Sequence, residues 1–153
     1  MVLCGISWYT SNTNSGKDRN IQLHELIKII PKDKYDIVNL QYGDFKKEIN
    51  KINVKDNLLI ETVEEIDIYN DIDGFASLIE QCDLVISIGN STAHLSAALG
   101  KDTRVLLPRI PSWRWHLDTN KCDWYSSVKV YRQEIDHNWN EPLNELKNNL
   151  IKI

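Results

Sequence analysis

At 153 residues, the chain has the length of one domain and can bury a proper core. Hydrophobic residues make up 42% and charged residues 26%, which is typical of a soluble globular protein, and the formal net charge of −4 gives no support to nucleic-acid binding. No apolar run approaches the ~20 residues that a membrane span needs, and the first residues lack the features of a signal peptide.

The hydrophobic pattern predicts strands that alternate with helices along the chain. Strands are expected at 2–7, 35–40, 58–61, 84–88, 103–107 and 128–132. Helices are expected at 19–30, 45–52, 73–81, 91–100 and 141–150, the third of them capped by Asp73. This alternation indicates an α/β protein, a three-layer Rossmann-like fold in which helices cover both faces of a parallel sheet. We expect one domain over residues 1–153.

The three cysteines favour a reducing compartment. The chain has an odd number of cysteines, Cys4, Cys82 and Cys122, so they cannot all pair within it. No two of them have the spacing of metal ligands. Cys4 falls in a predicted strand and Cys82 just before one, so both are expected to be buried thiols. A cytoplasmic location follows as the expectation. The first strand begins at once, as it would in a domain excised from a longer chain.

The segment 83–99 is the most informative part of the sequence. A buried strand ends in the polar turn formed by Gly89, Asn90, Ser91 and Thr92, and a helix rich in small residues follows. Such a turn predicts an anion site, because the first N–H groups of a helix lack backbone partners and the helix dipole is positive there. Gly89 would let a ligand approach the backbone, and His94 in the first turn could donate to it. The alternatives are an ordinary strand-to-helix connection and a histidine that only caps the helix.

Polar or basic loops follow four of the predicted strands. They are 8–19, 41–44, 89–92 and 108–118, and the first ends with Lys17 and Arg19. Cations at the start of a helix oppose its dipole, so this placement favours a bound anion. Because ligands of such sheets bind beyond the carboxyl ends of the strands, the four loops together predict a phosphate-bearing ligand.

Common nucleotide and hydrolase motifs are missing from the sequence. The residues around Lys17 lack the glycine and the hydroxyl that a P-loop needs, and no G-x-G-x-x-G follows a strand. No serine elbow or His/Cys pairing suggests covalent hydrolysis. Asp71 and Asp73 could be a metal pair, but a solvated Asp71 beside a capping Asp73 is the favoured interpretation. We therefore expect neither a cofactor nor a metal.

Ordered motifs along nearly the whole chain resemble one family. The chain is similar to the donor-binding, C-terminal half of inverting glycosyltransferases that have two Rossmann-like halves (the B-type fold). The heptosyltransferase-like domain that ends many bacterial tetratricopeptide-repeat proteins is the group it most resembles. The matching segments are 5–8, 40–44, 71–74, 83–87, 90–95, 98–100, 113–115, 124–126, 132–133 and Trp139.

The resemblance implies that the chain binds a nucleotide-sugar. The diphosphate would lie at 90–94, approached by the loop that ends with Lys17 and Arg19. Trp113 and Trp115 could stack on a base or anchor their loop to the core. The expected nucleotide-sugar-binding residues are Ser7, Lys17, Arg19, Gln41, Gly89, Asn90, Ser91, Thr92, His94 and Trp113.

The sequence also departs from this family. Heptosyltransferases usually carry Asp-Thr-Gly where this chain has Gly89-Asn90-Ser91, so a sugar contact made by that Asp would be lost. The acceptor-binding half, which commonly supplies the general base in these enzymes, has no counterpart here, and no catalytic residue is assigned. We therefore expect a half-enzyme that needs an acceptor domain or partner. The alternative is a non-catalytic nucleotide-binding or interaction module of a tetratricopeptide-repeat protein.

Overall fold

The computed structural model describes residues 1–14, 16–117 and 120–152. Six strands form a single sheet in the order β3-β2-β1-β4-β5-β6, and all five strand pairs are parallel within these ranges. The strands are β1 (Val2–Ser7), β2 (Tyr35–Asn39), β3 (Ile60–Glu61), β4 (Leu84–Ile88), β5 (Asp102–Leu107) and β6 (Val128–Arg132).

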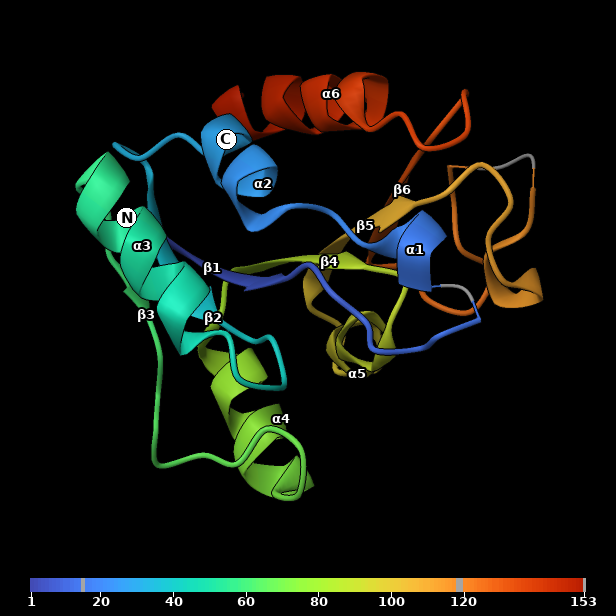
Figure 1. Cartoon of the computed structure of the whole chain (residues 1–153). Coiled ribbons are helices and arrows are strands. Elements are labelled where there is room, and N and C mark those ends of the chain that lie inside the picture. Colours follow the sequence, from blue (N-terminus) through green and yellow to red (C-terminus); the bar gives the residue numbers. More distant parts are fainter. Residues whose placement is uncertain (15, 118–119, 153) are drawn as a thin grey trace.

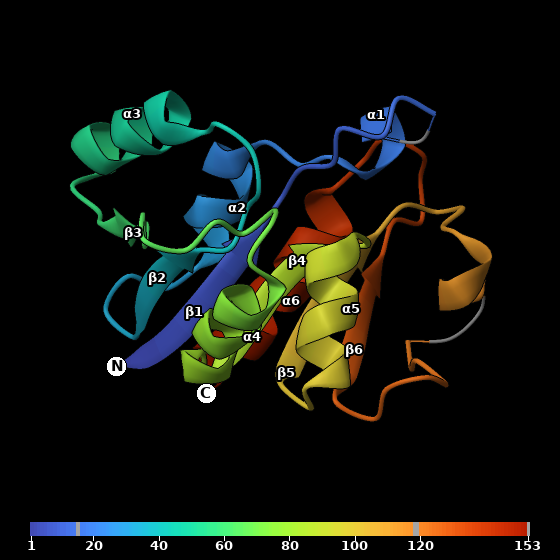
Figure 2. The same ribbon diagram turned by 90° about the horizontal axis from the view of Figure 1, so that it is seen from below.

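Helices cover both faces of this sheet. They are α1 (Gly16–Arg19), α2 (Leu23–Ile29), α3 (Lys46–Asp56), α4 (Ile72–Gln81), α5 (Ser91–Ala98) and α6 (Asn140–Ile151). Helices α2 and α6 lie on one face, and α4 and α5 lie on the opposite face (Figures 1 and 2). The predicted α/β, Rossmann-like three-layer architecture is therefore confirmed. No helix in the described part of the chain is both long and apolar enough to cross a membrane.

The strand order places a topological switch point between β1 and β4. The chain runs outward from β1 through β2 to β3 and then returns to β4 on the other side of β1. The predicted strand of segment 83–99 is β4, and it lies near the centre of the sheet as expected. Ligands of open parallel sheets bind at such a point, beyond the carboxyl ends of the two strands.

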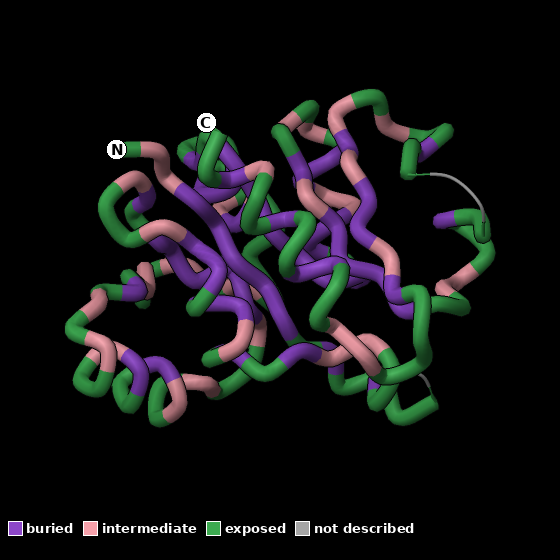
Figure 3. The backbone as a smooth tube through the Cα atoms, turned by 90° about the horizontal axis from the view of Figure 1, so that it is seen from above, coloured by how far each residue is buried: buried purple, intermediate pink, exposed green. Residues whose placement is uncertain are grey.

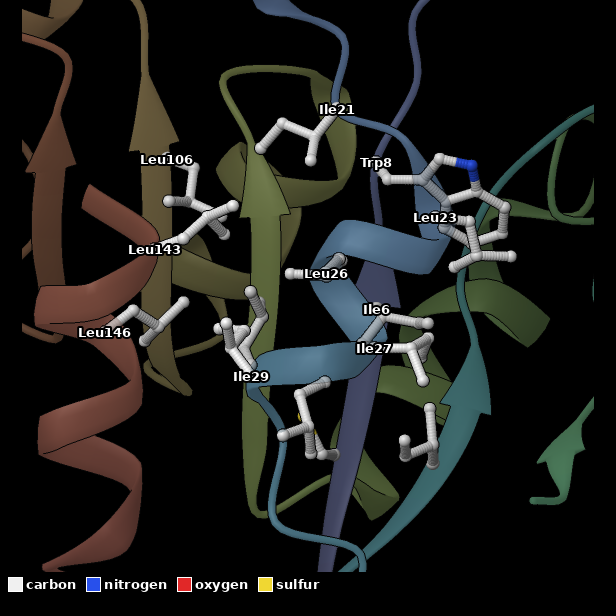
Figure 4. Close-up of a cluster of buried hydrophobic side chains, with 14 of the residues drawn as sticks. Ile6, Trp8, Ile21, Leu23, Leu26, Ile27, Ile29, Leu106, Leu143 and Leu146 are labelled. Atoms are coloured by element: carbon white, nitrogen blue, oxygen red, sulfur yellow. The ribbon is translucent and has the colours of Figure 1, made fainter. Parts of the chain in front are cut away.

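Both faces of the central strands are buried, which explains their continuous apolar sequences. Leu84, Ile86 and Ile88 of β4 belong to one core cluster, and Val85 belongs to the cluster on the opposite face. Figure 3 shows long buried stretches in the strands at the centre of the molecule. Figure 4 shows the first cluster, in which side chains of α2 and α6, such as Leu26, Ile27 and Leu143, pack with Ile6 of β1 and Leu106 of β5.

The helix expected at 19–30 is present but begins later than predicted: α2 starts at Leu23, and the short α1 before it, which ends at Arg19, was not expected. Asn20 N donates to Gly16 O at 2.9 Å and so completes α1, while its side chain bonds to the loop after β1: Oδ1 accepts from Thr10 N at 2.7 Å, and Nδ2 donates to Thr10 O at 3.1 Å. Ile21 N donates to Trp8 O at 3.1 Å. These bonds tie the break between the two helices to the loop after β1, a long-range pairing that helical periodicity does not reveal.

Asp71, rather than Asp73, caps α4. The Asp71 side chain accepts a hydrogen bond from Gly74 N at 2.8 Å, and the helix begins at Ile72. The prediction that Asp73 is the cap is therefore wrong, although Asp71 is exposed as expected. The three-residue spacing from cap to N–H donor is the usual one for N-capping.

The long loop after β5 contains an element that was not predicted. A short 3-10 helix, η1 (Trp113–Trp115), turns the chain back toward the sheet. Its last residue, Trp115, is 2% exposed and belongs to the core beneath α5, whereas Trp113 is 69% exposed. One of the two predicted roles, anchoring this loop to the core, is therefore filled by Trp115.

Candidate functional site

Gln41 joins the carboxyl ends of β1 and β2. Its side chain is buried, and its Oε1 accepts hydrogen bonds from Ser7 Oγ at 3.1 Å, Trp8 N at 3.0 Å and Tyr9 N at 2.8 Å. Three donors on one carbonyl oxygen fix the path of the chain as it leaves β1. Gln41 therefore shapes the start of the first loop.

Asn90 extends this network to β4 and α5. Its Oδ1 accepts from Ser87 Oγ at 2.9 Å and from Ala93 N at 3.3 Å, which makes it the N-cap of α5. Its Nδ2 donates to Ser7 Oγ at 2.9 Å and to Tyr9 O at 3.4 Å. The side chains of Ser7, Gln41 and Asn90 thus hold together the turns that follow β1, β2 and β4.

A cleft of about 480 Å³, here called the α5 cleft, lies in front of this network. Figure 2 shows α1 and the start of α5 at the same end of the sheet. None of the described residues that line the cleft is Asp or Glu, and two are arginines. The lining residues are Thr10, Asn12, Arg19, Tyr42, Gly89, Asn90, Ser91, His94, Ser112 and Arg114.

The two arginines reach the α5 cleft from different loops. Arg19, at the end of α1, donates from Nη1 to Gly89 O at 3.0 Å, which places its guanidinium beside the turn that opens α5. Arg114 belongs to η1, and its guanidinium carbon lies 4.8 Å from the centre of the Trp113 ring. With the first N–H groups of α5, these side chains make the cleft electropositive in a chain of net charge −4.

His94 forms the inner wall of the α5 cleft. Its ring stacks on Trp115 with centroids 4.7 Å apart, and its Nδ1 lies 3.3 Å from Tyr125 Oη. Burial, and secondarily the charge of Arg114, lower the pKa of His94 below its usual value of 6.5. A neutral imidazole therefore faces the cleft at pH 7, and an anion bound there would favour its protonation.

Gly89 is required by the core beneath the turn. A Cβ at this position would lie 2.8 Å from Leu107 Cδ2 and 3.2 Å from Trp115 Nε1. A side chain here would push the end of Leu107 aside and press on the Trp115 ring. The close packing of Leu107 and Trp115 thus accounts for the glycine, although Gly89 also lines the cleft.

The structure brings together some of the predicted ligand-binding residues and separates others. Arg19, Gly89, Asn90, Ser91 and His94 line the α5 cleft, while Ser7 and Gln41 lie in the network behind it. Three other predicted residues do not line the cleft. Lys17 and Trp113 are exposed elsewhere on the surface. Thr92 is buried, and its Oγ1 has no hydrogen-bond partner within the described ranges.

Sequence reasoning missed five residues of the α5 cleft. Thr10, Asn12, Tyr42, Ser112 and Arg114 all lie in loops that were expected to border the ligand, but none was singled out. Charge was the signal that could have identified Arg114, because it is a cation in the loop that follows β5.

A larger cavity, of about 760 Å³, adjoins the α5 cleft at the ends of β2 and β3. This β2–β3 cavity shares Tyr42 with the cleft, and Tyr42 Oη donates to Thr10 Oγ1 at 3.1 Å. Its walls combine aromatic rings with carboxylates. The lining includes Tyr9, Gln41, Tyr42, Asp44, Phe45, Lys46, Glu64, Asp67 and Tyr69.

Two of these acidic residues already have partners. Glu64 Oε1 lies 2.8 Å from Lys46 Nζ at the exposed surface. Asp67 accepts from the side chain of Asn70 and from the N–H groups of Tyr69 and Asn70, and these bonds lower the pKa of Asp67. Asp67 therefore stays ionised near neutral pH and fixes the loop before α4.

No group of three or more His, Cys, Asp or Glu side chains in the described part of the chain could hold a metal ion. The polar groups of the α5 cleft are instead hydroxyls, amides, an imidazole and guanidiniums. Such a set suits a ligand with phosphate or hydroxyl oxygens.

The chain is similar to Protein FlbA of Caulobacter vibrioides. The two sequences are 31% identical over 131 residues, which are 85% of this chain and 22% of FlbA. The chain thus spans about a fifth of the length of this relative. No protein-family profile matches it.

Proposed function

We propose that the chain is the nucleotide-sugar-binding half of an inverting, metal-independent glycosyltransferase of the heptosyltransferase-like type. The observation that carries this proposal is the composition of the α5 cleft. Two guanidinium groups and the start of an eight-residue helix meet in one cleft, and no carboxylate is present among its described lining residues.

This composition favours a diphosphate as the ligand. Helix starts bind phosphate through free N–H groups and the dipole, and arginine forms paired hydrogen bonds with phosphate oxygens. Arg114 can offer such bonds, and Arg19, which donates to Gly89 O, adds positive charge beside the start of α5. In glycosyl transfer the same groups would stabilise the charge that develops on the departing nucleoside diphosphate.

The β2–β3 cavity has the chemistry that a nucleoside needs. Tyr9, Phe45 and Tyr69 present aromatic rings to a base, and the exposed Asp44 carboxylate, whose Oδ1 also accepts from Lys46 N at 3.4 Å, can accept from ribose hydroxyls. Tyr42 lines both the β2–β3 cavity and the α5 cleft. One extended ligand could therefore occupy the cavity and the cleft together. The combined site therefore suits a nucleotide extended along the carboxyl edge of the sheet.

Nucleotide binding is the first test. UDP, GDP and ADP are titrated calorimetrically into the chain and into Arg114→Gln. Loss of a charged hydrogen bond, worth about 1.5–3 kcal/mol, predicts an affinity for the best diphosphate that is roughly 10- to 100-fold lower. Ser91→Asp is expected to weaken binding as well, because it adds a negative charge where the phosphates would lie.

Arg109→Gln is the matched control for Arg114→Gln. Arg109 is exposed, lies 3.6 Å from Asp136 and is not among the residues that line the α5 cleft. Its substitution should leave the affinity unchanged. Equal effects of the two arginine variants, or no binding of any of the three diphosphates, would contradict the proposal.

A non-catalytic nucleotide-binding module is the second candidate. The specific observation in its favour is the lack of a carboxylate among the described residues of the α5 cleft, which leaves no acidic general base beside the proposed phosphates. Both candidates predict diphosphate binding. They differ in whether sugar transfer occurs once an acceptor half is supplied.

A further inference from the structure

A separate, smaller cavity lies beside α1, beyond the ends of β5 and β6. Its volume is about 200 Å³, and it is here called the Gln133 cavity. The residues that line it come from α1 and from the segments that follow β5 and β6. They are Asp18, Pro108, Ile110, Gln133, Asp136 and His137.

Gln133 gives this cavity a buried hydrogen-bond donor without a partner. The residue is 2% exposed, and its Nε2 has no hydrogen-bond partner in the part of the chain that the structure describes. A buried polar group left unpaired costs stability, and proteins seldom retain one without a function. A ligand oxygen in the cavity would supply the partner once the Gln133 amide turns toward it.

Two carboxylates add acceptors at the rim of the same cavity. Asp18 Oδ1 lies 3.5 Å from His137 Nδ1, and Asp136 Oδ2 lies 3.6 Å from Arg109 Nη1. These long contacts leave carboxylate oxygens available to hydroxyl donors. A lining with two carboxylates and an amide disfavours an anion, but it suits a neutral group that carries several hydroxyls.

The Gln133 cavity is adjacent to the α5 cleft along two segments of the chain. On α1, Asp18 lines the cavity and the next residue, Arg19, lines the cleft. After β5, Ile110 lines the cavity, and Ser112 and Arg114 line the cleft. A group attached to a phosphate in the cleft therefore has a polar cavity within reach.

We infer that the Gln133 cavity holds the monosaccharide of the nucleotide-sugar, and that the Gln133 amide binds one of its oxygens. This inference rests on the proposed function, since it places the sugar by reference to the phosphates. The space equals the liquid volume of roughly seven water molecules, which is enough for a single sugar ring. The cavity would thereby contribute to the choice of sugar, separately from the groups that bind the nucleotide.

Gln133→Met tests the inference by replacing the amide with an apolar side chain of similar length. Calorimetry compares UDP with UDP-glucose, GDP with GDP-mannose and ADP with ADP-glucose. The variant is expected to bind the preferred nucleotide-sugar roughly 3- to 10-fold more weakly while its affinity for the matching diphosphate is unchanged. Gln81→Met, at an exposed glutamine of α4, should alter neither affinity.

Thermal unfolding separates a binding role of Gln133 from a structural one. Removing an unpaired buried donor should leave the melting temperature unchanged or raise it. A lower melting temperature, or equal losses of affinity for nucleotide-sugar and diphosphate, would overturn the inference and leave the proposed function standing. Unchanged affinity of Gln133→Met for both nucleotide-sugar and diphosphate would also overturn the inference and leave the proposed function standing.

Free sugars make the test independent of nucleotide binding. Glucose and mannose are added to ¹⁵N-labelled chain, and the side-chain amide signal of Gln133 is identified by its absence in Gln133→Met. A selective shift of that signal supports the sugar cavity even if every diphosphate fails to bind. If both sugars leave it unmoved, and no nucleotide-sugar is bound more tightly than its diphosphate, the inference is overturned.

Discussion

Single polar residues hold the carboxyl edge of the sheet together. The Gln41 carbonyl oxygen takes three donors, and the Asn90 side chain bonds to both of the strands that flank the switch point. Sequence reasoning identified Gln41, Asn90 and Ser7 as polar residues at strand ends but expected them to contact the ligand. Their partners depend on which strands are neighbours, and an isolated motif does not contain that information.

His94 shows how the cleft adjusts a titratable group. Burial and the charge of Arg114 lower the pKa of His94, so the folded chain binds fewer protons than the unfolded chain as the pH falls below about 6.5. The free energy of unfolding should therefore decrease as the pH falls below about 6.5. The decrease due to His94 should end once the pH is below the lowered pKa of His94 in the folded chain. Urea unfolding at a series of pH values should show a shallower decrease for His94→Asn. Parallel curves for the two proteins would contradict this.

The same histidine should link ligand binding to pH. A bound diphosphate would raise the pKa of His94, so its binding should take up protons and strengthen as the pH falls toward 6. Calorimetry in buffers of different ionisation enthalpy measures that uptake. The uptake should be reduced in His94→Asn; an equal uptake would assign the protons to another group.

At the scale of elements, apolar runs predicted the strands better than periodicity predicted the helices. The bounds of β1 and β6 agree with expectation: β1 is a mostly apolar run, and β6 alternates buried valines with half-buried Lys129 before Tyr131. The helix expected at 19–30 begins only at Leu23, because the Asn20 side chain and Ile21 N bond to the loop after β1. Helix α3 continues to Asp56, four residues beyond the expected end, and stops where Asn57 adopts a left-handed conformation.

The cap of α4 gives a direct test at this scale. Asp71→Ala removes the hydrogen bond to Gly74 N and should lower the free energy of unfolding by about 1 kcal/mol more than Asp73→Ala does. Each variant removes one negative charge from the start of the same helix, so the comparison isolates the cap. Urea unfolding measures both. An equal or larger loss in Asp73→Ala would support the sequence-based assignment instead.

For the whole molecule, the position of the candidate site could be predicted from the alternation of strands and helices, but its composition could not. Parallel strands bring their following loops to one edge of the sheet, and this rule by itself predicts a ligand near segment 89–92. Arg114 and Tyr42 belong to the α5 cleft because the loops after β5 and β2 reach it. Those loops are irregular, so their paths depend on contacts between distant residues, such as the packing of Trp115 beneath His94.

The last prediction concerns the activity of the chain by itself. If it is the donor-binding half of a transferase, it should not transfer sugar to an acceptor by itself, because in such enzymes a second half binds the acceptor and commonly supplies the general base. Positioning and base catalysis together account for many powers of ten in rate, so their loss should leave at most slow hydrolysis of the donor.

Release of diphosphate from UDP-glucose, GDP-mannose and ADP-glucose, followed with and without candidate acceptors, measures this activity. Arg114→Gln should reduce any slow hydrolysis, because the guanidinium would stabilise the leaving diphosphate, whereas Arg109→Gln should not. Robust acceptor-dependent turnover by the chain alone would refute the half-enzyme hypothesis. Diphosphate binding without turnover, even after the acceptor half is supplied, would favour a non-catalytic module whose cleft binds the nucleotide as a ligand rather than a substrate.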